Sequence, residues 1–199
     1  YKEAVFSYLT GYGNQESKEI KEAKKLLKSE KDIIAAKTYF PKELFIENKI
    51  IDYLSSNKED YVGALDIIGE KVLLIMCQSV QSRFFNEILE RGIDKGVISE
   101  DDSLIIPGYN NSNSSGKLKY IEEEVLKEND FPLELFRNED FPYLSLTSTK
   151  RKAYFQVKDM KTDVLEDEEF KMGKKIVLTF KLSSGSYATT LLEHFFDLR

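Results

Sequence analysis

Apolar residues recur at helical spacing along the first two thirds of the chain, and this pattern predicts a series of helices. Residues 1–9, YKEAVFSYL, form the first helix, which the breaker-rich TGYGNQES ends. Residues 17–37 are expected to form one amphipathic helix that starts at Ser17. We expect its lysines to face solvent, opposite the apolar positions Ile20, Ala23, Leu26 and Leu27.

Two further helices are predicted before residue 94. The first covers residues 41–56, because proline fits the first turn of a helix and Pro41 starts this one. Its apolar positions are Leu44, Phe45, Ile50, Ile51 and Leu54. The second covers residues 69–93, and Gly92 suits its C-terminal cap. We expect this longest helix to bury a stripe made of Val72, Ile75, Met76, Val80, Phe84 and Ile88.

Beyond this helix the pattern changes from helical to strand-like. DDSLIIPGY predicts a short strand, a polar loop follows, and LKYIEEEVLKEND predicts a helix. From about Phe141, β-branched and aromatic residues become frequent, and strands are predicted at AYFQVKDM (153–160) and KKIVLTFKL (174–182). We therefore expect an α+β chain with a helical body and a strand-rich tail. One face of the last strand carries Ile176, Leu178, Phe180 and Leu182.

Composition mainly excludes classes of protein. The 199 residues suffice for one large domain or two small ones, and the single Cys77 and single His194 exclude an internal disulfide framework and a Cys- or His-rich metal site. No apolar run has membrane-spanning length and the start lacks a signal-peptide pattern, so we expect a cytoplasmic protein with no membrane partner.

The net charge of −6 argues only weakly against nucleic acid as a partner, because lysines cluster locally. Since the chain begins without methionine and in helical register, we expect a piece of a longer protein.

The residues that could act as nucleophile or base do not form a recognisable active site. Cys77 lies in an apolar run and is expected to be inert packing, and His194 is expected on the surface of the last helix. The acidic stretches 100–102 and 166–169 are expected to be solvated loops. The sequence contains neither GxxxxGK[ST] nor GxGxxG, so it gives no support for a nucleotide-binding loop.

Three polar stretches need more explanation. In QSRFFN, Gln81, Ser82, Arg83 and Asn86 interrupt an apolar helix, and buried amides of this kind often lock two elements together. In TSTKRKAYF, a basic triplet lies beside hydroxyl and aromatic residues, a composition suited to phosphate contacts with RNA. This RNA-binding set is Lys150, Arg151 and Lys152.

The third stretch, SSGSYATTLL, places small and hydroxyl residues before the last helix. Ser186 is expected to cap a helix that begins near Tyr187, and Gly185 allows close approach of the backbone. The first amides of that helix would suit an anion such as phosphate. Equally, Tyr187 and Ala188 would simply shape a neighbouring pocket.

Three segments, in chain order, resemble the TruD family of pseudouridine synthases. QSRFFN followed by ILERGI resembles the family's QSxxFN…R segment, with Arg91 as the arginine. IIPGY followed by SGK is similar to the loop after that helix, and VLTFKLSSGSYATTLL is similar to the near-C-terminal strand that runs into G-S-[YF]-A-T. The resemblance extends from about residue 70 to the end, and the N-terminal helices fit the region after the family's NYFGxQRFG motif.

The chain departs from the family pattern at three places. Glu193 and His194 stand where the family usually has Arg-Glu, and a glycine that is common near TSTKRKA is missing. No G-x-K-D segment, the carrier of the family's catalytic aspartate, occurs in the chain. The resemblance therefore implies that the nucleophilic aspartate lies upstream and that no catalytic residue is present here.

The implied fold is a mainly helical TruD-type insertion domain at residues 1–158, followed at 159–199 by a strand and helix of the mixed-sheet synthase domain. The implied activity is isomerisation of uridine to pseudouridine in tRNA, with uridine-13 as the family target and without metal or organic cofactor. The implied active-site lining is Gly185, Ser186, Tyr187, Ala188 and Thr189. The residues implied to brace the domains are Gln81, Ser82, Asn86 and Arg91.

Two other functions stay open on the sequence. A non-catalytic RNA-binding module would use the same basic triplet, and its RNA affinity would weaken with salt. A helical protein-interaction domain with no RNA role would agree with the acidic net charge.

Overall fold

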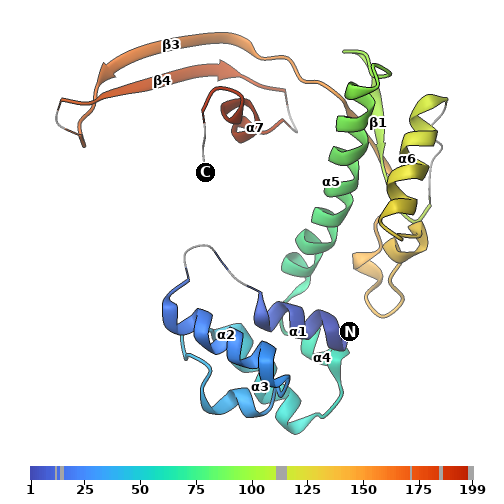
Figure 1. Cartoon of the computed structure of the whole chain (residues 1–199), viewed down its shortest axis with the longest axis vertical. Helices are drawn as coiled ribbons and strands as arrows, with labels where there is room; N and C mark the ends of the chain where they lie inside the picture. Colours follow the sequence, from blue (N-terminus) through green and yellow to red (C-terminus); the bar gives the residue numbers. More distant parts are fainter. Residues whose placement is uncertain (12, 14–15, 111–115, 171, 184–185, 197–199) are drawn as a thin grey trace. The chain divides into compact units, whose positions relative to one another are not determined.

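The computed structural model describes residues 1–11, 13, 16–110, 116–170, 172–183 and 186–196. The elements belong to two compact units (Figure 1). Helix α5 (Glu70–Asp94) contributes residues to both. Unit 1 comprises Tyr1–Phe84, Pro107–Asn111 and Leu126–Ser148, and unit 2 comprises Phe85–Ile106, Ser112–Val125 and Thr149–Arg199.

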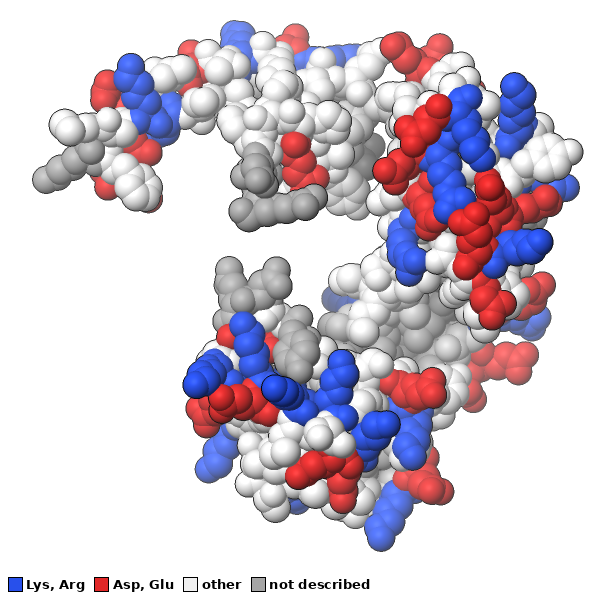
Figure 2. Space-filling view, viewed as in Figure 1, with Lys and Arg blue, Asp and Glu red and all other residues white. Residues whose placement is uncertain are grey.

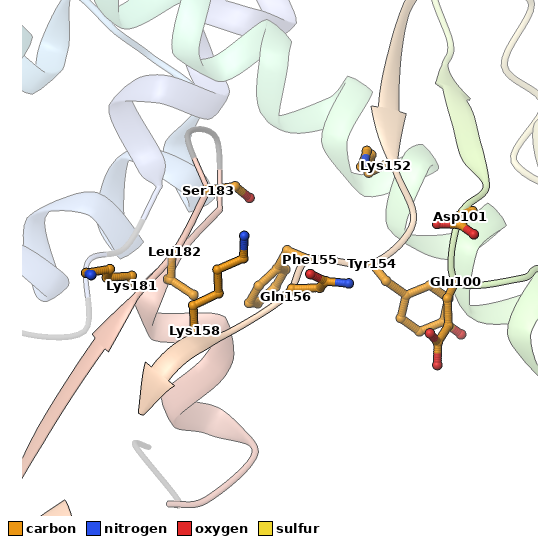
Figure 3. Close-up of a pocket in the computed structure, with 10 residues that line it drawn as sticks. All are labelled: Glu100, Asp101, Lys152, Tyr154, Phe155, Gln156, Lys158, Lys181, Leu182 and Ser183. Atoms are coloured by element: carbon orange, nitrogen blue, oxygen red, sulfur yellow. The ribbon is translucent and has the colours of Figure 1, made fainter. Parts of the chain in front are cut away.

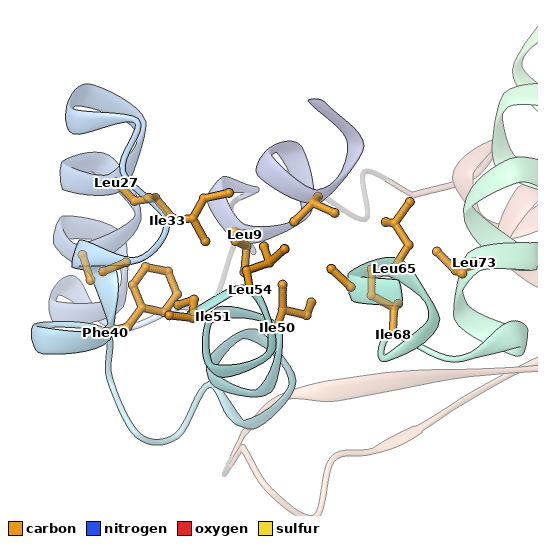
Figure 4. Packing of buried hydrophobic residues seen from close by; sticks show 14 of the residues in the cluster. Leu9, Leu27, Ile33, Phe40, Ile50, Ile51, Leu54, Leu65, Ile68 and Leu73 are labelled. Atoms are coloured by element: carbon orange, nitrogen blue, oxygen red, sulfur yellow. The ribbon is translucent and has the colours of Figure 1, made fainter. Parts of the chain in front are cut away.

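Unit 1 is helical and has its own hydrophobic core. Its main core is built from the helices of the first 84 residues and from Phe141 and Leu144, as Figure 4 shows for part of the cluster. Val5, Leu9, Leu27, Ile50 and Ile51 are fully buried there, so burial of apolar surface stabilises this unit. The helices are α1 (Lys2–Thr10), α2 (Lys18–Glu30), η1 (Ala35–Thr38), α3 (Phe45–Ser56), α4 (Tyr61–Asp66), η2 (Leu133–Phe136), η3 (Pro142–Leu144) and the first part of α5.

Helix α2 starts where the sequence predicts but ends earlier. The Ser17 hydroxyl accepts a hydrogen bond from the Ile20 backbone amide at 3.3 Å and caps the first turn. The expected continuation to residue 37 is wrong, because Lys31 adopts a left-handed conformation with φ of 57°. Asp32 then accepts hydrogen bonds from the Ile34 and Ala35 amides, both at 3.0 Å, and starts the separate turn η1.

Helix α3 begins at Phe45, four residues later than predicted from Pro41. The intervening residues form a turn in which the Leu44 amide donates to the Pro41 carbonyl at 3.2 Å. The Asn48 side-chain amide donates to the carbonyls of Pro41 and Leu44, at 2.7 and 2.8 Å, and holds this turn against the helix. Helix α4, which is capped by Asp60 through the Gly63 amide at 2.9 Å, was not predicted.

Helix α5 exists as predicted, but its buried face differs from the expected stripe. Leu73 and Phe84 are buried, whereas four predicted stripe residues are exposed: Val72, Ile75, Met76 and Val80 at 41%, 65%, 45% and 37%. Apolar residues occur on several sides of this helix, so periodicity alone does not select the face that is packed. The predicted stripe is therefore wrong over the N-terminal half of α5 and right at Phe84 and Ile88.

The cap of α5 is Gly96 and not Gly92. The Gly96 amide donates to the Ile93 carbonyl at 2.9 Å and the Val97 amide donates to the Gly92 carbonyl at 3.0 Å. This pair of bonds, with φ of 63° at Gly96, is a Schellman motif. Gly92 is instead buried inside the helix, where Ile98 occupies the space that a Cβ would need.

Unit 2 contains two separate antiparallel strand pairs, β1 (Ser103–Ile106) with β2 (Thr149–Lys152) and β3 (Lys158–Glu166) with β4 (Lys174–Lys181). Its buried apolar side chains come mainly from α5, β1 and α6 (Lys117–Glu128). They are Phe85, Ile88, Leu104, Ile105, Ile106, Ile121 and Val125. Leu191 of the short helix α7 (Ala188–Glu193) is also buried.

The β3–β4 hairpin has no buried residue among those that the structure describes. The predicted strand at 174–182 matches β4, whereas the strand predicted at 153–160 is wrong over residues 153–157, because β3 begins at Lys158. The face of β4 with Ile176 and Phe180 is exposed or half-buried. The family-based domain boundary between residues 158 and 159 falls at the start of β3 and stays a prediction.

Candidate functional site

The basic triplet forms most of strand β2, and strand geometry divides it between two faces. Arg151 pairs with Leu104 of β1, while Lys150 and Lys152 pair with its neighbours. Successive side chains of a strand point to opposite faces, so the two lysines share one face and Arg151 occupies the other. The Arg151 guanidinium carbon lies 5.3 Å from the centre of the Phe85 ring.

The two lysines are exposed and have no ion-pair partner in the part of the chain that the structure describes. Arg151 is exposed as well, and it differs from the two lysines by its contact with the Phe85 ring. On the visible faces in Figure 2, basic and acidic side chains are interspersed over both units. A phosphate contact on this acidic chain is therefore expected to depend on a local group of basic residues, such as the predicted set in β2.

Gln81 of α5 connects two loop segments of unit 1. Its side-chain amide donates to the Pro107 carbonyl at 2.7 Å and to the Thr147 carbonyl at 3.1 Å. The backbone of Gly108 lies so close to Leu146, Thr147 and Ser148 that a Cβ would be 2.6 Å from the Leu146 oxygen. The amide and the glycine together hold these segments in contact.

The other bracing candidates differ in their contacts. Ser82 is half-buried and Asn86 is exposed, and neither side chain makes a hydrogen bond within the described ranges. Arg91 is paired with Glu87 at 2.6 Å and lies 4.0 Å from Glu124 of α6. The geometry therefore gives Arg91 a charged contact between helices, whereas no hydrogen bond of the Ser82 or Asn86 side chain is found among the described residues.

Arg83, which the sequence reasoning did not include in the bracing set, also links two segments. Its guanidinium donates to the side-chain oxygen of Asn129 at 2.6 Å. The sequence indicates a polar residue in an apolar helix, since Arg83 lies inside QSRFFN. It does not indicate the partner, because Asn129 is 46 positions away.

Residues 187–190 are exposed, Ser186 is half-buried, and the predicted cap of the last helix is not formed. Helix α7 starts at Ala188, and Tyr187 occupies its cap position without a side-chain hydrogen bond. The prediction that Ser186 caps this helix is wrong, because its hydroxyl lies 3.0 Å from that of Ser183 instead. Gly185 lies outside the described residues.

The short α7 does not support the predicted anion site. A helix of six residues aligns few peptide dipoles, and this one lacks a polar cap. Tyr187, Ala188 and Thr189 are all exposed, Tyr187 by 63%. The role of these side chains in shaping a neighbouring pocket stays a prediction.

Cys77 is partly buried against a hydrophobic core and His194 is exposed, as the sequence predicts. Cys77 packs against the core of unit 1, and burial raises the pKa of its thiol, which keeps the sulfur protonated. His194 is exposed, and its Nδ1 lies 2.9 Å from the Thr190 carbonyl one turn earlier. Within the described ranges no group of three or more His, Cys, Asp or Glu residues could hold a metal ion, and no helix is long and apolar enough to cross a membrane.

Comparisons with known proteins identify relatives along nearly the whole chain. The family model described as tRNA pseudouridine synthase D (TruD) matches residues 1–106 and 101–195. Proteins named tRNA pseudouridine synthase D from Methanosarcina acetivorans and Methanopyrus kandleri are 28% and 29% identical to the chain. The matches cover 98% and 96% of this chain but 54% and 50% of those proteins. The chain thus spans about half the length of the curated relatives it matches.

The solved structures agree with the sequence relatives. A crystal structure of a tRNA pseudouridine synthase D (TruD) from Methanosarcina mazei is 28% identical, with a TM-score of 0.83 over 98% of this chain and 54% of that one. The α+β class expected from the sequence is confirmed by this match. Since the family model covers well over half of its residues, the chain belongs to the TruD family of tRNA pseudouridine synthases.

Proposed function

We propose that this chain is part of an enzyme that isomerises uridine to pseudouridine in tRNA, with uridine-13 as the target. The observation that carries the proposal is the family match over residues 1–195, together with the structural likeness at a TM-score of 0.83. In this reaction the base is detached from the sugar at nitrogen and rejoined through carbon. All atoms are conserved, so the overall reaction needs no co-substrate.

The catalytic aspartate is proposed to come from a segment of the parent enzyme outside these 199 residues. The sequence has no G-x-K-D segment and spans about half of its relatives. The exposed Tyr187, Ala188 and Thr189 support a role as pocket lining, because their side chains are available to another segment. Together with Gly185 and Ser186 they would surround the base after it leaves its stack.

Binding of the tRNA is proposed to involve the lysines of β2. Lys150 and Lys152 supply positive charge on one exposed face, which suits contacts with the RNA backbone. Such contacts position the RNA without reading its sequence. Because its substrate would be tRNA, the cytoplasm is the compartment we propose for the enzyme.

The proposal is tested by measuring pseudouridine in tRNA transcripts after incubation with the full-length parent or with this chain. The parent is expected to modify the tRNA, and a transcript with cytidine at position 13 should stay unmodified. The isolated chain should produce no pseudouridine. An inactive parent would refute the proposed function. An active isolated chain would refute the proposal that the catalytic aspartate comes from outside these 199 residues.

A further inference from the structure

Unit 2 contains a cavity of about 560 Å³ that the bracing and lining residues do not use (Figure 3). Its walls come from the loop before β1, the end of β2, the linker to β3 and the end of β4. Its volume lies within the range of small-molecule sites, roughly 300–1,000 Å³. The residues that determine its chemistry are Glu100, Asp101, Lys152, Tyr154, Phe155 and Lys158.

Aromatic and cationic groups occupy the linker side of this cavity. Tyr154 and Phe155 are adjacent in the linker, and Tyr154 is 39% exposed. Lys152 and Lys158 flank this pair in sequence and have no ion-pair partner in the described part of the chain. Lys181 also lines the cavity, but it is paired with Asp159 at 2.7 Å. Two uncompensated lysines beside two rings suit a group that carries both a phosphate and a flat base.

Two carboxylates lie at the end of the cavity that also holds the Tyr154 ring. Figure 3 shows the Tyr154 ring on the same side as Glu100 and Asp101, and Lys158 on the side of β4. The neighbouring Asp102 is used internally, since its carboxylate accepts a hydrogen bond from the Ser99 amide at 2.7 Å. Glu100 and Asp101 have no such internal bond among the described residues. They are thus free to accept hydrogen bonds from the amino group of a base.

We propose that this cavity binds one unpaired nucleotide of RNA, with the base against Tyr154 and the phosphate at Lys152 or Lys158. The carboxylates of Glu100 and Asp101 would select a base with an exocyclic amino group over uracil, which has none. The proposal rests on the proposed function, in that the ligand is RNA. Lys152 belongs both to the lysine face of β2 and to the wall of the cavity. RNA whose backbone contacts this face would therefore also have one base recognised in the cavity.

The test measures binding of fluorescein-labelled single-stranded RNA 10-mers to the 199-residue chain by fluorescence anisotropy. Tyr154→Ala is expected to weaken the binding of oligo(C) by about 5- to 150-fold, because one stacked base is lost. Tyr154→Phe should retain most of the affinity, since the ring remains. Tyr120→Ala is the matched control, because Tyr120 is 73% exposed and does not line the cavity.

The carboxylates are tested through base preference. Unmodified chain should bind oligo(C) and oligo(A) more tightly than oligo(U), and the Glu100→Gln/Asp101→Asn variant should reduce this preference. Circular dichroism checks that each variant is folded. Equal oligo(C) affinities for Tyr154→Ala and Tyr120→Ala would overturn the proposal, and so would an unchanged preference in the double carboxamide variant.

Assays of the parent enzyme separate this inference from the proposed function. Tyr154→Ala in the parent should raise KM for tRNA while the Tyr120→Ala parent keeps its KM. An active parent whose KM is insensitive to Tyr154→Ala would overturn the nucleotide site alone. A parent that forms no pseudouridine would instead overturn the proposed function.

Discussion

Gln81 and Gly108 show how single residues hold unit 1 together. The Gln81 amide satisfies the carbonyls of Pro107 and Thr147, which lie 26 and 66 positions away in the chain. The polar interruption of an apolar helix is visible in the sequence, and it indicates that an amide needs partners. Which carbonyls are bonded depends on where the chain places these two loops.

Gly108→Ala is expected to lower the free energy of unfolding by about 1–3 kcal/mol. The added Cβ would collide with backbone atoms of Thr147 and Ser148, which yield less readily than a flexible side chain. The measurement is urea unfolding of the chain. Gly11→Ala is the control, because its nearest contact would be the Ser7 oxygen at 3.2 Å, and it should cost clearly less. Equal losses for the two variants would contradict the close backbone approach.

Lys24 is an exception to the prediction that the lysines of α2 face solvent. It is buried, and its ammonium donates to the Glu16 carboxylate at 2.6 Å and to the Gly11 carbonyl at 2.7 Å. This hydrogen bond from Lys24 lowers the pKa of Glu16 below its ordinary value of 4.5. Breaking a buried pair by removing one charge is destabilising, because the other charge stays buried.

Unit 1 is therefore expected to lose stability in acid. A carboxylate with a depressed pKa in the folded state contributes stability above its unfolded pKa, near 4.5, and loses it as the pH falls through the lower folded value. Urea midpoints measured between pH 7 and pH 3 should decrease over this window. Glu16→Gln should lower the midpoint at pH 7 and flatten its decrease in acid. Glu19→Gln, an exposed position on α2, should leave both unchanged, and a similar effect of the two variants would contradict this assignment.

At the scale of elements, helix α5 illustrates what periodicity determines and what it leaves open. Its existence and length follow from a long apolar pattern, and the structure confirms them within two residues. The pattern does not determine the C-terminal cap of the helix, because Gly92 and Gly96 lie about one turn apart and either glycine could end it. Gly96 is selected because the chain needs φ of 63° there, while Gly92 is packed beside Ile98.

Gly96→Ala is expected to destabilise the chain by about 1 kcal/mol, since an L residue in the left-handed region costs about 1–2 kcal/mol. Gly96→Asn should recover part of this loss, because asparagine tolerates that conformation better than alanine. Thermal unfolding followed by circular dichroism measures both. If alanine and asparagine were equally tolerated, the Schellman end of α5 would be contradicted.

The β3–β4 hairpin shows that an apolar pattern can predict a strand correctly without predicting that one face of the strand is buried. Alternating apolar residues predict a strand with one buried face, and β4 is indeed a strand. Its apolar residues are nevertheless exposed or half-buried, with Ile176 at 52%. A two-stranded hairpin is marginally stable alone, because one strand pair offers little surface for burial. Local pattern therefore predicts the strand, but it does not determine whether the apolar face of that strand is buried.

At the scale of the whole molecule, the proposed RNA binding would have to overcome an acidic net charge of −6. A local pair of lysines on one strand face achieves this more readily than charge spread over the surface, because screening limits the reach of each charge to about 10 Å at 0.1 M salt. The basic triplet is visible in the sequence. The sequence does not show that the two lysines lie on one face and that Arg151 lies over the Phe85 ring. The pairing of β2 with β1 determines this.

The Lys150→Ala/Lys152→Ala variant is expected to bind tRNA more weakly and with a shallower dependence on salt. Each lost phosphate contact should reduce the slope of log K against log salt by about 1. Arg151→Gln should change the slope less, because its side chain packs against the Phe85 ring. Filter binding between 50 and 200 mM salt measures the three slopes. Equal slopes for the double variant and Arg151→Gln would contradict this division of the triplet.

The sequence by itself determined the order and type of most elements, the α+β class and the family, because these depend on local periodicity and on short motifs. Only the tertiary structure decided that Lys24 is buried and which face of α5 is packed. It also brought together the cavity walls, in which Glu100 and Asp101 meet residues more than 50 positions later. The physical reason is that burial, strand register and cavity shape depend on contacts between distant segments, and local pattern does not specify which distant segments meet.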